Sequence, residues 1–304
     1  MSKYERTVEN LSFDFRTGRP TAISGHKTGE AQRATCSAIN AARTSGILEA
    51  AQSYAPGEQV PVDVWTNSFE RALNDWETPL IELSNLGLNY DNEGFLNSSY
   101  LTPLKSGAEA EPYWDEEYGV VYKLFNLRNT GALGKKLVLD RMTEDEEFQI
   151  DFRDADLRHT LTKLSVLNDA GALATEIVGL ADSGDYLVAK QPLATPFKDF
   201  KDDLRTAISA IRAIVPSRGG FRQNVAIISL NGRPWVVGDL HDRNIMRDSF
   251  GRPCIIDALI GAITPAAMSQ MSWLREAVAD AAIFRKTGKK PSYDLFDEID
   301  DSEL

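Results

Sequence analysis

The sequence predicts an α+β fold, in which antiparallel strands and amphipathic helices occupy separate stretches of the chain. Short apolar runs separated by turn residues indicate β-strands in three stretches, residues 100–125, 174–193 and 225–237. Apolar residues at three- and four-residue spacing indicate helices in three others, residues 154–168, 200–215 and 266–285. A hydrophobic content of 42% and a charged content of 26% are ordinary for a globular protein with a sizeable core.

The composition excludes several classes of protein. A net charge of -12 disfavours binding to nucleic acid or to an anionic membrane, because phosphate contacts need clustered Lys and Arg. A nucleotide site is compatible with this charge, since a few local cations and a metal ion suffice. No apolar run reaches the length of a membrane span, and the two cysteines are too few for a disulfide framework. We therefore expect a cytoplasmic protein.

The N-terminal part carries no recognisable chemistry. Residues 1–29 lack periodicity and predict an extended or disordered arm. Residues 29–54 are rich in alanine and favour a helix, and a second helix is expected over residues 68–76. Aromatic residues in this second helix are interpreted as core, so the first ninety or so residues predict packing and no activity.

Lys123 is the first residue that indicates a site. It interrupts the apolar run V-V-Y-K-L-F of a predicted strand, and burying an ammonium is costly unless an anion lies nearby. The alternative is an edge-strand lysine that points to solvent. Residues 126–149, which follow, are polar and mixed in charge, and we expect their acidic group at 144–147 to be a solvated surface.

The most informative stretch contains Asp239, Asn244 and Asp257. Each aspartate follows a short apolar strand, and residues 247–251 between the two strands have the composition of a hairpin turn. If residues 245–246 pair with 254–256, three oxygen-bearing side chains converge on one cleft. The alternative is that Asp and Asn are simply common turn residues.

This stretch, G-D-L-H-D-R-N-I-M followed by I-I-D, resembles the catalytic loop and metal-binding aspartate of the protein kinase-like superfamily. Together with V-G-L and Y-L-V-A-K-Q-P upstream, it is most similar to the Ser/Thr/Tyr kinase-like domains found in polyvalent proteins of phages and mobile elements. The resemblance covers about residues 100–265. It implies a bilobal fold with an N-lobe of antiparallel sheet plus helix, a reduced and mostly helical C-lobe, and an N-terminal helical extension. The implied domains are residues 1–95, 96–192 and 193–304.

The resemblance also implies a role for each matched residue, with ATP and Mg²⁺ as the bound groups. The catalytic residues would be Asp239 as base, Lys123 on the phosphates and Arg243 on the acceptor or a phosphate. The nucleotide would lie against Gly107 and Ala108 of the phosphate-covering turn and Lys190 and Gln191 next to the hinge. The metal ligands would be Asn244 and Asp257. The acceptor would be a protein or small-molecule hydroxyl, since aminoglycoside and choline kinase-like enzymes carry a similar segment.

The sequence departs from this family in three places. The helix at 154–168 has no glutamate to pair with Lys123, so Asp156, Asp154 or the acidic group at 144–147 would have to substitute. Only Gly107 remains of a glycine-rich loop, and the chain after Asp257 is too short for a standard substrate platform. These departures leave open a pseudokinase that binds nucleotide or a partner, and transfer of AMP is a third alternative. Three histidines without metal-ligand spacing do not support zinc, and a packing or hydrogen-bonding role is expected for His241.

Overall fold

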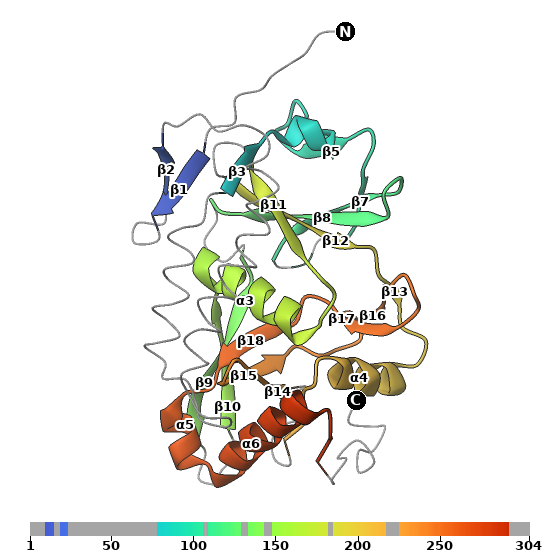
Figure 1. Ribbon diagram of the computed structural model, residues 1–304. Helices are drawn as coiled ribbons and strands as arrows, with labels where there is room; N and C mark the ends of the chain where they lie inside the picture. The colour runs from blue at the N-terminus through green and yellow to red at the C-terminus, as the bar shows by residue number, and fades with distance from the viewer. Residues whose placement is uncertain are drawn as a thin grey trace.

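The structure is a computed structural model, and its described part covers most of the chain after residue 77 (Figure 1). The described residues are 10–14, 19–23, 78–105, 107, 109–128, 133–142, 148–181, 185–216 and 225–291. The predicted helices at 29–54 and 68–76, the acidic group at 144–147 and the acidic end of the chain lie outside them.

The α+β prediction is confirmed by several largely antiparallel sheets and four α-helices in the described part. The largest sheet has eight strands in the order β2-β1-β3-β11-β12-β8-β7-β6, and of these contacts only β3 with β11 is parallel. Its strands are β1 (Asn10–Asp14), β2 (Arg19–Ile23), β3 (Thr78–Ile81), β6 (Thr102–Pro103), β7 (Glu111–Asp115), β8 (Val120–Asn126), β11 (Glu176–Ala181) and β12 (Tyr186–Pro192). A small hairpin of β4 (Leu88–Tyr90) and β5 (Leu96–Ser98) follows a 3-10 turn, η1 (Leu83–Leu86).

The N-terminal arm differs from the prediction. Within residues 1–29, β1 and β2 form an antiparallel hairpin, and β1 also pairs with β3. Residues 10–14 and 19–23 therefore extend the large sheet. Since β3 pairs in turn with β11, part of the first 95 residues belongs to the same sheet as Lys123.

Helix α3 (Leu157–Ala170) lies against the large sheet in the middle of the molecule (Figure 1). It begins after Asp156, whose carboxylate accepts a hydrogen bond of 2.7 Å from the His159 amide, and it ends at Gly171 with φ of 101°. Leu157, Leu161 and Leu164 are buried, as their three- and four-residue spacing predicts.

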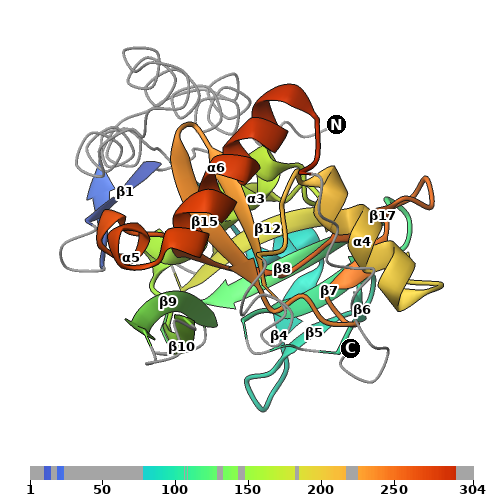
Figure 2. The ribbon, with the colours of Figure 1, turned by 90° about the horizontal axis from the view of Figure 1, so that it is seen from below.

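The other half of the molecule is built from short hairpins and three helices. Strand β14 (Ala226–Leu230) pairs with β15 (Arg233–Gly238) across the predicted Asn231-Gly232 turn, where both residues have positive φ. Figure 2 shows helix α6 crossing this hairpin. The remaining elements are β13 (Thr195–Pro196), α4 (Phe200–Ala210), β16 (Ile245–Arg247), β17 (Pro253–Ile255), β18 (Leu259–Ala262), α5 (Pro265–Gln270) and α6 (Ser272–Thr287).

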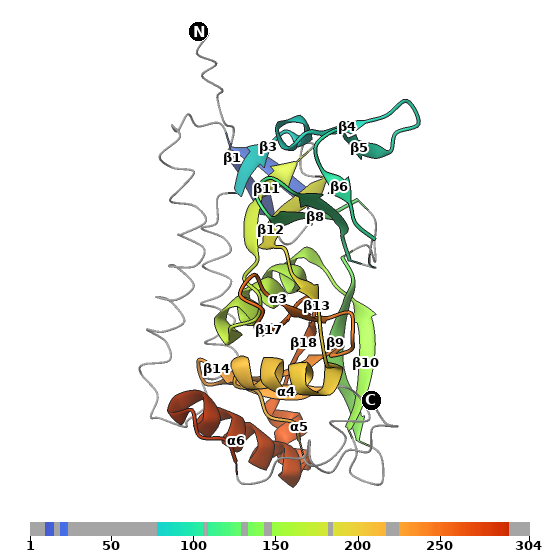
Figure 3. The ribbon, with the colours of Figure 1, turned by 90° about the vertical axis from the view of Figure 1, so that its right-hand side faces the viewer.

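Two features of this half differ from the sequence prediction. The single helix expected over 266–285 is divided at Met271, whose extended backbone separates α5 from α6. The polar stretch 126–149, for which no strand was expected, contains β9 (Lys135–Met142), which pairs with β10 (Phe148–Asp154). Figure 3 shows this ribbon along one side of the lower half. Leu137 of β9 is only 4% exposed, so the ribbon contributes to the core.

One hydrophobic cluster connects the two halves. It combines sheet residues such as Phe125 and Leu187, helix α3, and lower residues such as Ile228, Trp235 and Ile255. The large sheet and the lower hairpins thus share a continuous core. Within the described part, no helix combines the length and the apolar character needed to cross a membrane.

Candidate active site

The predicted ribbon of β16 and β17 carries the site. Ile245 lies opposite Ile255 in the antiparallel register, and the Ile256 amide donates a 2.9 Å hydrogen bond to the Asn244 carbonyl. This register brings Asn244 alongside Ile256, one residue before Asp257. Arg247 at the end of β16 donates from Nε to the buried Asp203 carboxylate of α4 at 2.7 Å, which fixes the ribbon to that helix.

Asn244 and Asp239 are joined directly. The side-chain Nδ2 of Asn244 donates to the backbone carbonyl of Asp239 at 2.8 Å and to its Oδ2 at 3.0 Å. Because both bonds use the nitrogen of the amide, the other polar atom of this buried side chain is Oδ1, an oxygen of the type that binds hard cations.

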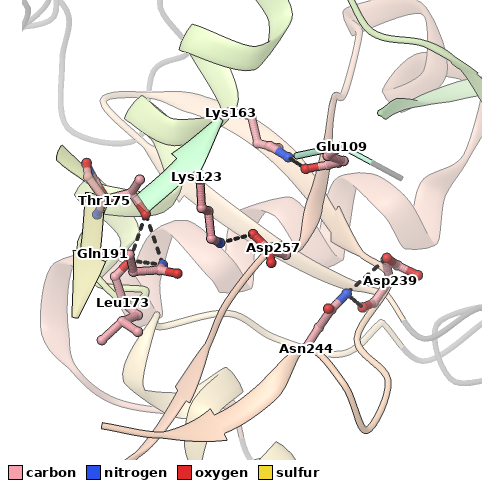
Figure 4. A network of polar contacts seen from close by, with 10 residues as sticks. Glu109, Lys123, Lys163, Leu173, Thr175, Gln191, Asp239, Asn244 and Asp257 are labelled. Carbon is pink, nitrogen blue, oxygen red and sulfur yellow. Dashed lines mark hydrogen bonds and ion pairs between the residues drawn. The ribbon is translucent and has the colours of Figure 1, made fainter. Parts of the chain in front are cut away.

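Lys123 and Asp257 form the second pair, shown with the first in Figure 4. They lie 134 residues apart in the sequence and meet because β8 places Lys123 on the sheet face toward the ribbon. The Lys123 side chain is 9% exposed, so its ammonium is buried with a carboxylate partner. Burial acts to raise the pKa of Asp257, but the attraction of Lys123 and Lys163 outweighs it, so the pKa lies below the usual value and the carboxylate is charged.

The partners expected for Lys123 on or near α3 bind elsewhere. Asp156 caps α3, and Asp154 pairs with Lys135. In the described part, the carboxylate that reaches Lys123 is that of Asp257. The interpretation of Lys123 as a solvent-facing edge lysine is wrong, because β8 is an inner strand between β12 and β7.

Lys123, Asp239, Asn244 and Asp257 all border one cavity of about 580 Å³. Its walls combine the apolar side chains of Leu104, Val121, Phe125, Met246 and Leu259 with residues 192–194, where the chain leaves β12. This volume falls within the range of small-ligand sites, which are mostly apolar with a few convergent polar groups.

The other predicted site residues occupy different positions. Gly107 and Arg243 line the cavity, whereas Ala108 lies outside the described residues. Gln191 also borders the cavity, but its Nε2 donates to the Leu173 carbonyl at 3.2 Å and to Thr175 Oγ1 at 3.0 Å, to the left of Lys123 in Figure 4.

Lys190 is separate from this group. It alternates with Gln191 along β12 and pairs with Glu176 of β11 at 3.1 Å. Lys190 is not among the described residues that border the cavity. Its ammonium therefore neutralises a cross-strand carboxylate on the sheet.

His241 has the hydrogen-bonding position that the sequence predicts. Its Nδ1 accepts from the Arg243 amide at 3.1 Å, and its Nε2 lies 3.3 Å from Asp239 Oδ1. With Nδ1 as acceptor, a neutral imidazole carries its proton on Nε2, the ring nitrogen that lies near Asp239. Asn244 Nδ2 donates to one carboxylate oxygen of Asp239, and His241 lies beside the other.

The sequence did not indicate that Glu109 and Lys163 belong to this region. Glu109, from the loop over the cavity, forms an ion pair with Lys163 of α3 (Figure 4). The Lys163 side chain is 3% exposed and that of Glu109 is 16% exposed. Burial raises the pKa of Glu109 above its usual value, although Lys163 acts in the opposite direction.

The residues present suit Mg²⁺ better than a metal held by protein ligands alone. No group of three or more His, Cys, Asp or Glu side chains with metal-binding geometry occurs among the described residues. Asp257 and the Asn244 amide oxygen supply two hard ligands, and Mg²⁺ is commonly held by one or two carboxylates together with substrate phosphates.

Comparison with known proteins identifies no matching family, no similar curated protein and no similar solved structure.

Proposed function

We propose that this chain is an ATP- and Mg²⁺-dependent phosphotransferase of the protein kinase-like type, acting on a protein or small-molecule hydroxyl. One observation carries the proposal. Lys123 and Asp257 come from distant parts of the chain and pair within the same cavity as the joined Asp239 and Asn244. A buried lysine, two carboxylates and an amide are the groups that phosphoryl transfer requires.

The nucleotide would occupy the 580 Å³ cavity, with its base among the apolar walls. Residues 192–194 border the cavity where β12 ends and would meet the edge of the adenine with their backbone. At the other end, the Lys123 ammonium would bind the phosphates once Asp257 turns to the metal.

Asn244 and Asp257 would hold the metal ion. Mg²⁺, when bound there with the nucleotide, would neutralise charge on the phosphates. Asp239 lies beside these ligands with its side chain 38% exposed, so an acceptor hydroxyl can reach it. In the reaction, the acceptor oxygen forms a bond to the γ-phosphorus, its proton passes to Asp239, and the bond to the β–γ bridging oxygen breaks to release ADP.

The arrangement also supports the bilobal interpretation. The large sheet with α3 would be the N-lobe, and the hairpins with α4, α5 and α6 would be a reduced C-lobe. The cavity lies where these two parts meet, and residues 192–194 connect them.

The test is incubation of the full chain with γ-labelled ATP and Mg²⁺ in the presence of candidate protein and small-molecule acceptors. We expect label on the chain itself or on an acceptor, and its loss in both Asp239→Ala and Asp257→Ala. Incorporation from α-labelled ATP instead would identify transfer of AMP and reject phosphoryl transfer.

A second candidate is a pseudokinase that binds nucleotide without transferring phosphate. It is favoured by α3, which directs Lys163 toward the site where a carboxylate partner for Lys123 was expected. Binding of ATP to the wild type with no turnover on any acceptor would support this candidate. Turnover that depends on Asp239 would reject it.

A further inference from the structure

The buried ion pair of Glu109 and Lys163 has no part in the proposed transfer reaction. The two residues lie 54 positions apart and join a loop to the interior of a helix. Lys163 is 2% exposed as a residue, so the pair is desolvated. A buried ion pair is weak evidence for stability, because an apolar pair of similar volume often stabilises equally well. Stability alone therefore does not explain why this ion pair lies next to the cavity.

The loop held by this pair covers the cavity. Leu104, Lys105, Gly107, Glu109 and Ala110 all border the cavity, so the position of Glu109 determines the position of its wall. Glu109 also interacts electrostatically with Asp257 and Lys123, which places it at the end of the cavity assigned to the phosphates.

A glycine makes room for this contact. A Cβ atom on Gly134 would lie 2.1 Å from Glu109 Cγ, and Gly134 has φ of 78°, so another residue here would displace the Glu109 side chain and strain the backbone. Lys135, the next residue, borders the same cavity. Three separate segments thus meet around the Glu109 carboxylate: the loop, α3 and the start of β9.

We propose that Lys163 is a positioning residue, which through Glu109 holds Gly107 and Ala110 at the phosphate end of the cavity. The proposal rests on the proposed nucleotide site. In this arrangement α3 is connected to the covering loop and not to Lys123. Lys123 is left with Asp257 as its partner.

The test uses the full chain with four variants: Lys163→Met, Glu109→Gln, the double variant, and Lys163→Arg. Dissociation constants for a fluorescent ATP analogue with Mg²⁺ are compared with urea unfolding of the same proteins. Each neutral single variant leaves one unpaired group, so both stability and affinity should fall, and affinity should fall by about tenfold. Lys163→Arg preserves the charge and should retain affinity to within about threefold.

The double variant separates positioning from stability. It removes both charges, so its stability should return toward the wild-type value, whereas its nucleotide affinity should remain about tenfold weaker because the loop is no longer held. Wild-type affinity in the double variant would overturn the proposal. So would a loss of affinity that follows the loss of stability across all four variants.

Hydrogen exchange in the absence of nucleotide makes the proposal testable even if the wild type binds no ATP. Amides of residues 109–115 should lose protection in Lys163→Met and in the double variant, and keep it in Lys163→Arg. Unchanged protection in the first two would reject the positioning role. Absence of ATP binding with the expected exchange pattern would reject the proposed function alone.

Discussion

The two aspartates of the cavity, Asp239 and Asp257, both have positive φ, of 62° and 49°. Asp and Asn adopt this left-handed conformation more readily than most residues, but it still costs energy and is retained where the surrounding structure imposes it. Asp239 directly follows β15, and Asp257 comes two residues after the end of β17. The chain turns sharply at both positions. The turn directs both carboxylates into the cavity.

Substitution of Asp257 tests this strain together with the ion pair. We expect Asp257→Ala to lower the free energy of unfolding by about 1–3 kcal/mol, because Ala tolerates positive φ poorly and buried Lys123 loses its partner. Asp257→Asn should cost roughly half as much, because Asn accepts this conformation and its oxygen still accepts a hydrogen bond from Lys123. Urea unfolding followed by circular dichroism measures both. Equal losses would contradict the explanation.

The sequence predicts part of the site because strand pairing brings the motif together. Asp239, Asn244 and Asp257 meet through a hairpin that local turn residues specify, and the break in an apolar run identifies Lys123. The partner of Lys123 lies 134 residues away in the sequence, and no local pattern identifies it. The family resemblance instead predicts a partner on or near α3. The pair of Glu109 and Lys163 was missed, although Lys163 shares a helix face with Thr160 and Leu167, which are both buried.

Among the elements, α3 carries a partly buried titratable group, His159, whose Nε2 is shielded from solvent. Its Nε2 has no hydrogen-bond partner in the described part of the chain. Burial lowers the pKa of His159 to about 4, assisted by the positive charges of Lys163 and Lys136. The neutral imidazole is therefore the form that the folded protein accommodates.

This depressed pKa predicts a dependence of stability on pH. Between pH 6.5 and about 4 the unfolded chain binds a proton at His159 that the folded chain does not bind, so stability falls as the pH is lowered. The loss amounts to at most about 3 kcal/mol for a shift of this size. Urea unfolding of His159→Leu across this range should show a shallower decline than the wild type. Parallel curves would show that His159 does not contribute.

A second element, β9, passes very close to β18. A Cβ atom on Gly261 would lie 2.4 Å from the backbone carbonyl oxygen of Leu137, and a main-chain atom cannot move aside as a flexible side chain can. Gly261→Ala should therefore destabilise the protein by about 1–3 kcal/mol, as measured by thermal unfolding. Gly107→Ala is the matched control, because a Cβ atom added there would have no atom within 4 Å among the described residues, and it should leave stability nearly unchanged.

Strand β9 was missed because its apolar run, residues 137–139, is short and has two charged residues on each side. Leu137 and Leu139 lie on one face and pack, with Ile150 of β10, against the core that includes Ile227 and Leu274. Lys136 and Val138 alternate with these leucines and lie on the other face, where both are only partly buried, as expected for a strand with one buried side. In contrast, α3 and the β14–β15 hairpin were predicted because helical spacing and an Asn-Gly turn are local signals.

For the molecule as a whole, the shared core decides whether the two parts behave as separate domains. Leu187 of β12 and Ile228 of β14 belong to the same cluster, at 0% and 1% exposure. The sequence predicts a domain boundary near residue 192. In the structure, side chains from before and after this residue pack together in one core. The cavity lies at this junction, so its shape depends on the packing of both sides.

Hydrogen exchange can establish whether this continuity makes unfolding cooperative. If one core serves both parts, the most protected amides of β12 and β15 should exchange with the same opening free energy, that of global unfolding. Leu187→Ala removes a fully buried side chain from β12 and should lower both values equally, by about 2–5 kcal/mol. Phe250→Ala, at a position that is 80% exposed, is the control and should change neither. A loss confined to β12 would show two independent units, and the cavity between them would then open without unfolding either part.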